Sequence, residues 1–385
     1  MSNVIERKLA SIQRIEKLEA IPGADFIECA YVLGWRVVVR KGDFAKNALA
    51  CYIEIDSLLP DEPPFAFLKD PKGKVPEEGF VHRLRTKKLK GVVSQGLVMP
   101  LSAFSSTIPA DVKIGEDVTE CIGVKKYEPP VQEKLKVGMA KASFPNFIPK
   151  TDEIRVQSIP WIIDAFSAAK VYVTVKLDGT SGTFFIKDGR FGVCSRNQEW
   201  KRPMPEPRWR ARLTEFALRF GVLKVLRKYG YLRAWQAGAR NTYWEVSDAY
   251  GIESLMNGLS GNYAIQGEIC GPGIQKNRMG LKVVQFFVFD VYDIDKRRYL
   301  DYHDQRVFID RLGKGQLRRV PEVGVFEFPW KTVDEVLNAA EGKYDNGHQR
   351  EGIVIRTIYE TTWNELGRGS FKAISNKYLL SEEDI

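Results

Sequence analysis

The stretch Thr174-Val-Lys-Leu-Asp-Gly-Thr180 decides the fold, because the chain is expected to reverse within it. β-rich runs at 171–175 and 182–186 lie on either side, so the pattern predicts a strand, a tight turn at Asp178-Gly179 and a second strand. Strand neighbours would partly bury Lys176 at the end of the first strand. Burial disfavours the charged form of an amine and lowers its pKa, which predicts a nucleophilic lysine. The alternative is an ordinary hairpin with a solvated lysine.

Further charged residues follow at the ends of β-rich runs. Asp178 lies on the same side as Lys176 if extended geometry continues, where it would orient the amine or hold a divalent cation through water. Each of the later residues has an ordinary alternative, a solvated side chain at a strand end. The later residues are Arg196, Gly267-Glu268, Phe289-Asp290, the run 351–356 (Glu-Gly-Ile-Val-Ile-Arg) and Lys372. Together and in this order they resemble the motif series of covalent nucleotidyltransferases.

The composition is that of a globular protein with a polyanionic partner. The 385 residues suffice for two domains, and 44% hydrophobic and 28% charged residues are ordinary values. Without a long apolar run or a signal peptide, the chain is expected to be cytoplasmic or otherwise intracellular, not secreted and not membrane-bound. The five cysteines are scattered, which disfavours a disulfide framework or a zinc site. The net charge of +9 favours a polyanion as partner.

Residues 1–125 are predicted to form an all-β domain. Short β-rich runs at 9–12, 26–32, 35–39 and 50–55 are separated by turn residues, which suits a small OB-like barrel. A basic run within this domain predicts contact with the phosphates of a nucleic acid. Its alternative is a solvated edge strand, because lysines often protect sheet edges. The cations of this run are Arg83, Arg85, Lys87, Lys88 and Lys90.

Residues 126–149 are rich in proline and lack periodicity, which predicts a linker, and residues 150–385 are expected to form a second, mixed α/β domain. A basic helical segment at about 199–235 is included in it. Residues 199–233 hold ten Lys or Arg against three acids, a net charge of +7. Nucleic acid is the expected partner of this segment, through Arg208, Arg210 and Arg212, and a membrane surface or a partner protein is the alternative.

Over residues 150–378 the chain resembles ATP-dependent polynucleotide ligases and, less closely, capping enzymes. The runs 34–39, 54–60 and 94–97 extend the resemblance to nick-sealing RNA ligases of the Deinococcus and Naegleria type, over nearly the whole length. The basic segment resembles an insertion relative to these ligases. The short stretch after Lys372 is expected to leave no room for the C-terminal barrel of DNA ligases and capping enzymes. The expected fold is a multi-domain α+β arrangement: an all-β OB-like barrel, then an ATP-grasp-like adenylyltransferase domain built on antiparallel sheets.

The resemblance implies a three-step ligation. Lys176 attacks the α-phosphorus of ATP, the AMP passes to an RNA 5′-phosphate, and a 3′-hydroxyl then displaces AMP. It further implies that Asp178, Glu268 and Glu351 hold Mg²⁺ or Mn²⁺, through water. By the same resemblance, Phe289 and the Val175 backbone contact adenine, and Arg196 contacts ribose or phosphate. Arg155 is implied to contact the leaving phosphates, and Lys372 the α-phosphate.

The sequence departs from the family pattern at two places. Ser181 stands where many RNA ligases have asparagine, and Ser370 and Ile374 flank Lys372 where a second lysine is usual. Lys377 is a substitute at an unusual spacing. Arg155 has an ion pair with Asp152 or Glu153 as its alternative.

The sequence leaves three hypotheses about the function. The first is an ATP-dependent RNA ligase, a monomer that acts on a nicked RNA duplex. The second is DNA sealing or GTP-dependent capping, and the third is a non-catalytic RNA-binding protein on the same scaffold. The intact set of Lys176, Asp178, Glu268, Glu351 and Lys372 argues against the third.

Overall fold

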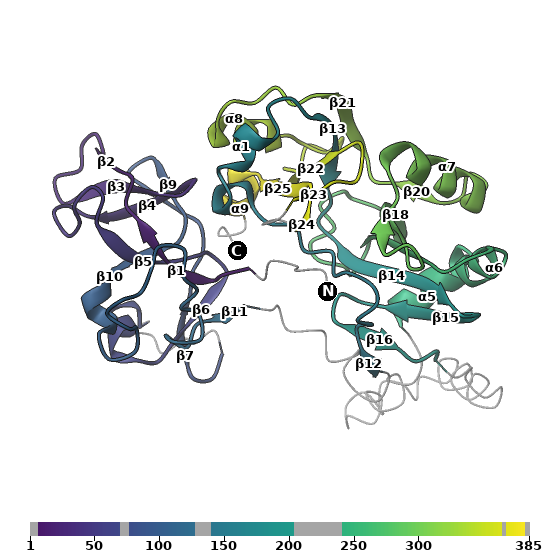
Figure 1. Ribbon diagram of the computed structural model, residues 1–385, viewed down its shortest axis with the longest axis horizontal. Coiled ribbons are helices and arrows are strands. Elements are labelled where there is room, and N and C mark those ends of the chain that lie inside the picture. The colour runs from purple at the N-terminus through teal and green to yellow at the C-terminus, as the bar shows by residue number, and fades with distance from the viewer. Residues whose placement is uncertain (1–6, 70–76, 128–139, 204–240, 364–366, 382–385) are drawn as a thin grey trace, which may run out of the picture.

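The computed structural model describes residues 7–69, 77–127, 140–203, 241–363 and 367–381. The N-terminal part forms short antiparallel sheets with the strand orders β1-β5-β10, β2-β3-β4 and β11-β6-β7, and β8 pairs with β9 (Figure 1). The elements are β1 (Ala10–Arg14), β2 (Lys17–Ala20), β3 (Ile27–Val32), β4 (Trp35–Arg40), β5 (Leu49–Ile53), β6 (Ser57–Pro60), η1 (Pro63–Leu68), β7 (Phe80–Arg83), β8 (Lys87–Leu89), β9 (Val92–Ser94), β10 (Leu97–Pro100), η2 (Leu101–Phe104) and β11 (Lys125–Lys126).

Strand β5 organises this part of the chain because its side chains alternate between two apolar clusters. Cys51 and Ile53 pack into one cluster, whereas Ala50 and Tyr52 pack into the other, next to Trp35. This alternation follows from the two-residue period of a strand. The prediction of short strands in the N-terminal part is therefore confirmed.

The C-terminal part contains two antiparallel sheets. The larger has the order β12-β16-β15-β14-β17-β18-β19, with β20 parallel to β18, and the smaller has the order β21-β13-β22-β25. The strands are β12 (Ala140–Ser143), β13 (Lys170–Lys176), β14 (Thr180–Lys187), β15 (Arg190–Cys194), β16 (Gln198–Trp200), β17 (Tyr263–Cys270), β18 (Gln285–Asp293), β19 (Arg298–Tyr299), β20 (Arg318–Arg319), β21 (Glu322–Glu327), β22 (Gly352–Thr357), β23 (Thr362–Trp363), β24 (Gly367–Arg368) and β25 (Ser370–Ile374).

Helices cover one face of each sheet. Residues of α5, α6 and α7 share an apolar cluster with β14, β15, β17 and β18, and residues of α1 and α8 share another with β13, β22 and β25. None of the described helices is long and apolar enough to cross a membrane. The helices are η4 (Val156–Ser158), α1 (Ile162–Ala165), α5 (Thr242–Ala249), α6 (Ile252–Asn257), α7 (Tyr302–Gly313), α8 (Val333–Ala340) and α9 (Asn376–Leu380).

The predicted strand–turn–strand around Lys176 is present, but the hairpin alternative is wrong. Strand β13 pairs with β21 and β22, whereas β14 pairs with β15 and β17, so residues 177–179 carry the chain from the smaller sheet to the larger one. Gly179 is required at this crossing, since a Cβ there would lie 2.5 Å from the carbonyl oxygen of Ile269. The crossing therefore places Lys176 where the two sheets meet.

Two further details concern residues 242–257 and the predicted linker. The helical residues between 242 and 257 form two helices, α5 and α6, because Gly251 between them has a left-handed backbone with φ 61°. The proline-rich stretch 126–149 contains a described strand, since β12 pairs with β16 at the edge of the larger sheet.

The N-terminal and C-terminal parts contact each other through polar groups. The amide of Gly34 donates to the carbonyl oxygen of Gln157 at 2.9 Å, and a Cβ on Gly34 would lie 2.8 Å from the Gln157 Cα. Ser158 donates its hydroxyl to Glu54 at 2.5 Å, and Arg36 pairs with Asp334 of α8. The N-terminal part thus rests against η4, the segment that directly follows Arg155.

Candidate active site

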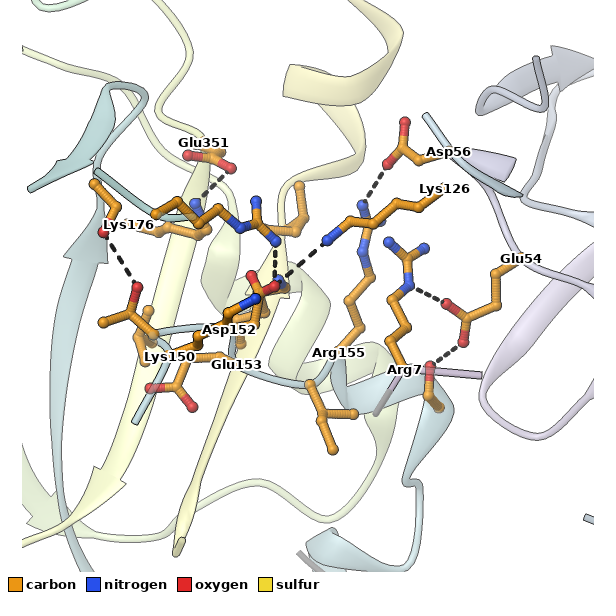
Figure 2. A pocket seen from close by; sticks show the side chains of 18 of the residues that line it. Arg7, Glu54, Asp56, Lys126, Lys150, Asp152, Glu153, Arg155, Lys176 and Glu351 are labelled. Carbon is orange, nitrogen blue, oxygen red and sulfur yellow. Dashed lines mark hydrogen bonds and ion pairs between the residues drawn. The ribbon is translucent and has the colours of Figure 1, made fainter. Parts of the chain in front are cut away.

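Lys176 lies at the end of β13, where the register with β22 sets its closest partner. It is opposite Gly352, and the residue before that glycine is Glu351. The Lys176 Nζ lies 2.7 Å from Glu351 Oε1, and Figure 2 shows the two side chains meeting at the cavity. Neighbouring residues of these strands, such as Val173 and Ile355, face the apolar cluster under α1 and α8. Lys176 therefore points away from that core by strand alternation.

The predicted pKa of Lys176 is wrong in direction. Burial alone would lower the pKa of this amine, but Glu351, Glu268 and Asp178 together raise it above its ordinary value. The lysine is therefore held as an ammonium ion in the ligand-free protein. The sequence argument failed because it counted burial but not the combined charge of Glu351, Glu268 and Asp178, two of which come from distant parts of the chain.

These carboxylates come from three different segments. Glu268 is on β17, opposite Ser181 of β14, and Asp178 is in the crossing between the sheets. Burial, with Glu351 and Asp178 nearby, raises the pKa of Glu268 to about 8, although Lys176 lowers it. The raised pKa means that Glu268 is mostly protonated at neutral pH.

Carboxylate oxygens are the donors that Mg²⁺ and Mn²⁺ prefer, so the cluster fits a divalent cation chemically. Within the described ranges no group of three or more His, Cys, Asp or Glu side chains is close enough to hold a metal ion directly. Binding of a hydrated cation through its water shell, which the sequence predicts, stays a prediction.

A second charged group surrounds Lys372 on β25. Its amide donates to the carbonyl oxygen of Ile154 at 2.8 Å, which fixes the strand beside the segment 151–155. Burial lowers the pKa of Lys372 to about 7, and the positive charge of Lys176 lowers it further, although Asp152 raises it. Asp152 itself pairs with Arg196, and with Lys126 at 3.4 Å.

Arg155 has a partner that the sequence did not predict. Its Nη2 lies 3.2 Å from Asp56 Oδ2 of the N-terminal part, so neither Asp152 nor Glu153 is its ion pair (Figure 2). The Arg155 Nη1 is buried and finds no hydrogen-bond partner among the described residues. This leaves a donor of a buried guanidinium available to an anion in the cavity.

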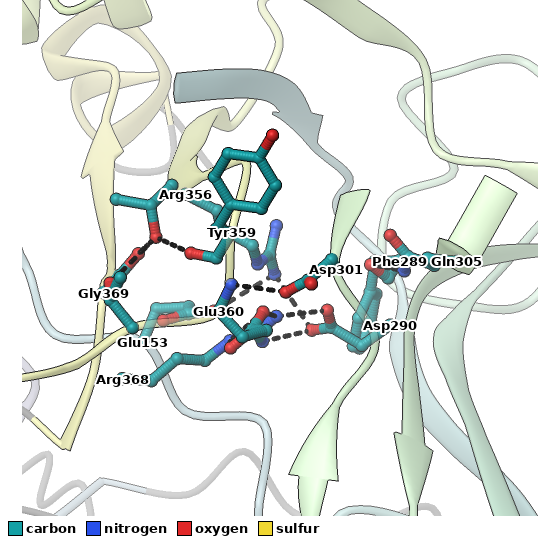
Figure 3. A network of polar contacts seen from close by, with 12 residues as sticks. Glu153, Phe289, Asp290, Asp301, Gln305, Arg356, Tyr359, Glu360, Arg368 and Gly369 are labelled. Carbon is teal, nitrogen blue, oxygen red and sulfur yellow. Dashed lines mark hydrogen bonds and ion pairs between the residues drawn. The ribbon is translucent and has the colours of Figure 1, made fainter. Parts of the chain in front are cut away.

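Phe289 lies on β18 beside a buried network of charges. It is partly buried and shares an apolar cluster with Val175 and Leu177. The next residue, Asp290, accepts two hydrogen bonds of 2.8 Å from Arg368 and one of 3.3 Å from Arg356. Figure 3 shows Arg356, Arg368 and Asp290 converging from three different strands, β22, β24 and β18. The network therefore fixes the register of the strand that carries Phe289.

The sequence reasoning missed most of this network. Arg356 also pairs with Glu153 at 3.1 Å. Arg368 also pairs with Glu360 at 2.5 Å, and its central guanidinium carbon lies 3.8 Å from the centre of the Tyr299 ring. Only the pattern Phe-Asp, followed later by an arginine in the run 351–356, indicated such a pair.

The predicted nucleic-acid residues fall into three groups. Arg85, Lys87, Lys88 and Lys90 are exposed on and beside the β8–β9 hairpin. Arg83 is different, because it pairs with Asp56 at 2.7 Å and lies 3.7 Å from the centre of the Tyr127 ring. The third group, Arg208, Arg210 and Arg212, lies outside the described residues.

The structure shows what surrounds the residues at which the sequence departs from the family pattern. The Ser181 hydroxyl lies 3.2 Å from that of Thr151, and Ser370 and Ile374 are buried. Lys377 is exposed and lies 3.7 Å from Glu341, so it does not take the place of a second lysine at the cavity.

One cavity of about 1600 Å³ is lined by the residues that the sequence predicts for catalysis and nucleotide binding. Residues of the N-terminal part also line it, among them Arg7, Glu54, Asp56 and Arg83. The cavity brings together Lys176, Asp178, Glu268, Glu351, Lys372, Arg155, Arg196, Val175 and Phe289.

Sequence-family models match two parts of the chain. A model described as RNA ligase matches residues 169–374, which hold Lys176, Glu268, Glu351 and Lys372. This chain belongs to the RNA ligase family. A model described as an OB-fold domain matches residues 9–101 of this RNA ligase.

Solved structures are similar over nearly the full length of this RNA ligase. Naegleria gruberi RNA ligase with PPi is 34% identical, with a TM-score of 0.81, and the match covers 98% of this chain and 100% of that chain. A lysine-to-methionine mutant of it with AMP and Mn gives the same identity, coverage and TM-score. A lysine-to-alanine mutant with ATP and Mn is 33% identical, with a TM-score of 0.80, and covers 98% and 100% of the two chains. Among curated proteins, none matches this chain in sequence.

These findings confirm the predicted fold class, an OB barrel followed by a mixed α/β ligase domain with antiparallel sheets.

Replacing Arg368 by methionine is expected to lower the free energy of unfolding by about 3–5 kcal/mol, because Asp290 and Glu360 would lose their buried counter-charge. Chemical denaturation measures the change. The control is Arg319→Met, which breaks a solvent-exposed pair with Asp310 and should cost less than about 1 kcal/mol. Equal costs for the two variants would contradict the role given to the Asp290 network.

Proposed function

We propose that this RNA ligase uses ATP and a divalent cation to seal 3′-hydroxyl/5′-phosphate breaks, nicks in RNA duplexes in particular, through lysine-AMP and RNA-adenylate intermediates. The observation that carries the proposal is the position of Lys176, 2.7 Å from Glu351 and facing the same cavity as Glu268, Asp178 and Lys372. The complexes of the Naegleria gruberi ligase with ATP and Mn, and with AMP and Mn, support it.

In the first step the Lys176 amine attacks the α-phosphorus of ATP, so that a nitrogen–phosphorus bond forms and pyrophosphate leaves. The amine must first lose a proton and separate from Glu351, which holds it as an ammonium ion. Bound among Asp178, Glu268 and Glu351, Mg²⁺ or Mn²⁺ would supply positive charge that neutralises the reacting phosphate. Lys372 and Arg155 also line the cavity and add positive charge there.

In the second step an oxygen of the RNA 5′-phosphate attacks the adenylate phosphorus, and the bond to Lys176 breaks. In the third step the 3′-hydroxyl attacks the 5′-phosphorus and AMP leaves. Phe289 and the Val175 backbone hold the adenine, and Arg196 contacts ribose or phosphate. Because the chemistry is phosphoryl transfer, these residues act by positioning and charge.

We further propose that the ligase works as a monomer, with an OB domain at 1–125, a nucleotidyltransferase domain at 150–385, and between them a linker at 126–149 whose strand β12 joins the larger sheet. Exposed cations on the β8–β9 hairpin, together with Arg208, Arg210 and Arg212, contact the RNA backbone. Arg83 is assigned here to the domain contact, because Asp56 and Tyr127 already engage it.

The Lys176→Ala variant is expected to lose covalent labelling by radioactive ATP completely, because no other amine faces Glu351 at the end of β13 among the described residues. Its melting temperature should stay close to that of the wild type. The control is Lys170→Ala, an exposed lysine at the start of the same strand, which should be labelled at the wild-type rate.

The same preparations test the substrate. Nicked duplexes are tested with every combination of RNA and DNA strands. Sealing is expected only where at least one of the two strands at the nick, the one with the 3′-hydroxyl or the one with the 5′-phosphate, is RNA. Efficient sealing of an all-DNA nick, or labelling by GTP in place of ATP, would overturn the proposed specificity. Persistent labelling of Lys176→Ala would overturn the assignment of the nucleophile.

AMP binding without metal at about pH 8 should be accompanied by proton uptake. The pKa of Lys372 is about 7 in the free protein, so the side chain is mostly neutral at this pH. A bound phosphate favours the charged form and raises this pKa, so the site takes up as much as about one proton. Below about pH 6 the lysine is already charged, and this uptake disappears.

Calorimetry in buffers of different ionisation enthalpy measures the uptake. Lys372→Met should remove most of it at about pH 8. Identical uptake in the wild type and in Lys372→Met would show that another group binds the proton.

Replacing Lys87 and Lys88 by glutamine should weaken binding of a nicked RNA duplex and flatten its dependence on salt, by about one unit of slope for each lost phosphate contact. Replacing Lys41 and Lys46, which are exposed elsewhere on the same part of the chain, changes the net charge equally and should leave the slope unchanged. If both double variants flatten the slope alike, the effect is one of net charge and the hairpin is not a specific contact.

A further inference from the structure

Arg278 is a buried arginine that the sequence motifs do not include. It lies between β17 and β18, and its side chain is only 9% exposed. Its Nε is 3.5 Å from Asp178 Oδ2, which is an ion-pair contact without a hydrogen bond from this nitrogen among the described residues, and the Asp178 side chain is 11% exposed. An ion pair this well shielded from water constrains both side chains more than a surface pair does.

The other side of the Arg278 guanidinium contacts the C-terminal helix. Its central carbon lies 4.5 Å from the centre of the Tyr378 ring, and its Nη1 donates to the Ser381 hydroxyl at 3.0 Å. Tyr378 is in α9, and the hydroxyl of Ser375 accepts the hydrogen bond that caps this helix. Arg278 therefore connects the carboxylate of the Lys176 turn to the helix that follows Lys372.

The segment that carries Arg278 is braced on its own. Asn277 donates to the carbonyl oxygen of Leu281 at 2.9 Å and accepts from the Leu281 amide at 3.1 Å. Asn346 donates to the carbonyl oxygen of Arg278 at 2.8 Å. A Cβ on Gly280 would lie 2.8 Å from the same Asn346 amide group, so the two segments pack closely. The backbone of Arg278 is thus fixed independently of Asp178.

We propose that Arg278 is a positioning residue for ligation: held by its own loop and by α9, it fixes the direction of the Asp178 carboxylate toward the cation among Asp178, Glu268 and Glu351. The inference rests on the proposed metal-dependent adenylation. Arg278 itself does not line the cavity and touches no reacting group.

A purely electrostatic role makes the opposite prediction for metal binding. Removing a cation next to the carboxylates would strengthen their attraction for Mn²⁺, because one repulsive charge is lost. Removing a positioning contact would weaken Mn²⁺ binding, because Asp178 would no longer be held in one orientation. The sign of the change therefore distinguishes the two roles.

The test compares Arg278→Gln and Arg278→Lys with the wild type and with Arg306→Gln. Arg306 is a matched control, because it also pairs with a carboxylate, Glu322, and lies against a tyrosine ring, that of Tyr302, but outside the cavity. Three quantities are measured: the single-turnover rate of lysine adenylation at saturating ATP, the Mn²⁺ affinity in the presence of AMP from the free-ion EPR signal, and the melting temperature.

Arg278→Gln is expected to lower both the rate and the Mn²⁺ affinity by about 10-fold to 100-fold, the usual effect of removing a residue that orients a metal-binding carboxylate. Arg278→Lys should fall between this variant and the wild type, because an ammonium can pair with Asp178 but cannot also stack on Tyr378 and reach Ser381. Arg306→Gln should stay within about twofold of the wild type in rate and affinity, as expected for an exposed pair.

Tighter Mn²⁺ binding in Arg278→Gln would overturn the proposal in favour of charge balance. A lower melting temperature with unchanged Mn²⁺ affinity would also overturn it and leave Arg278 a support of the fold. Failure of the proposed function is seen separately, as absence of labelling in the wild-type protein or full labelling in Asp178→Asn.

Discussion

The chain crosses from the four-stranded sheet to the eight-stranded sheet within residues 177–179, and the rest of the site depends on this crossing. Helices cover one face of each sheet, and Lys176 points away from the covered face of the four-stranded sheet. Charged residues at the ends of β13, β17 and β22 are therefore brought together without any of them entering an apolar core. The ion pair of Lys176 with Glu351 is the direct product of the register of β13 with β22.

The charges around this crossing are balanced in pairs that come from distant parts of the chain. Lys176 is paired with Glu351, Asp178 with Arg278, Asp152 with Arg196, and Asp290 with Arg368. Buried ions need partners because an unpaired charge in a low dielectric is costly. A ligand that brings phosphates and a cation into the cavity would compete with these pairs. Lys372 and Glu268 have pKa values of about 7 and about 8, so both groups can change protonation near neutral pH.

The sequence predicted what depends on local pattern. The strands around Lys176, the strand that carries Phe289 and the barrel-like N-terminal part follow from period-two alternation and turn residues, and the order of the motifs predicted which residues meet at one cavity. It did not predict the partners of arginines. Arg155 pairs with Asp56 across 99 positions of sequence, and Arg368 pairs with Asp290 across 78. Such pairs depend on how sheets and domains pack, which no local pattern contains. The direction of the Lys176 pKa was missed for the same reason.

Asp56 lies between two arginines that belong to different parts of the molecule, Arg83 beside it in the barrel and Arg155 across the domain contact. The barrel thus supplies the counter-ion for a guanidinium at the catalytic cavity, while the hydrogen bond from Gly34 to Gln157 holds the adjoining backbone. A chimaera that joins this barrel to the catalytic domain of another ligase would combine surfaces whose charges were matched to different partners. Such a chimaera is expected to keep this contact only where the acid and the arginine are exchanged together.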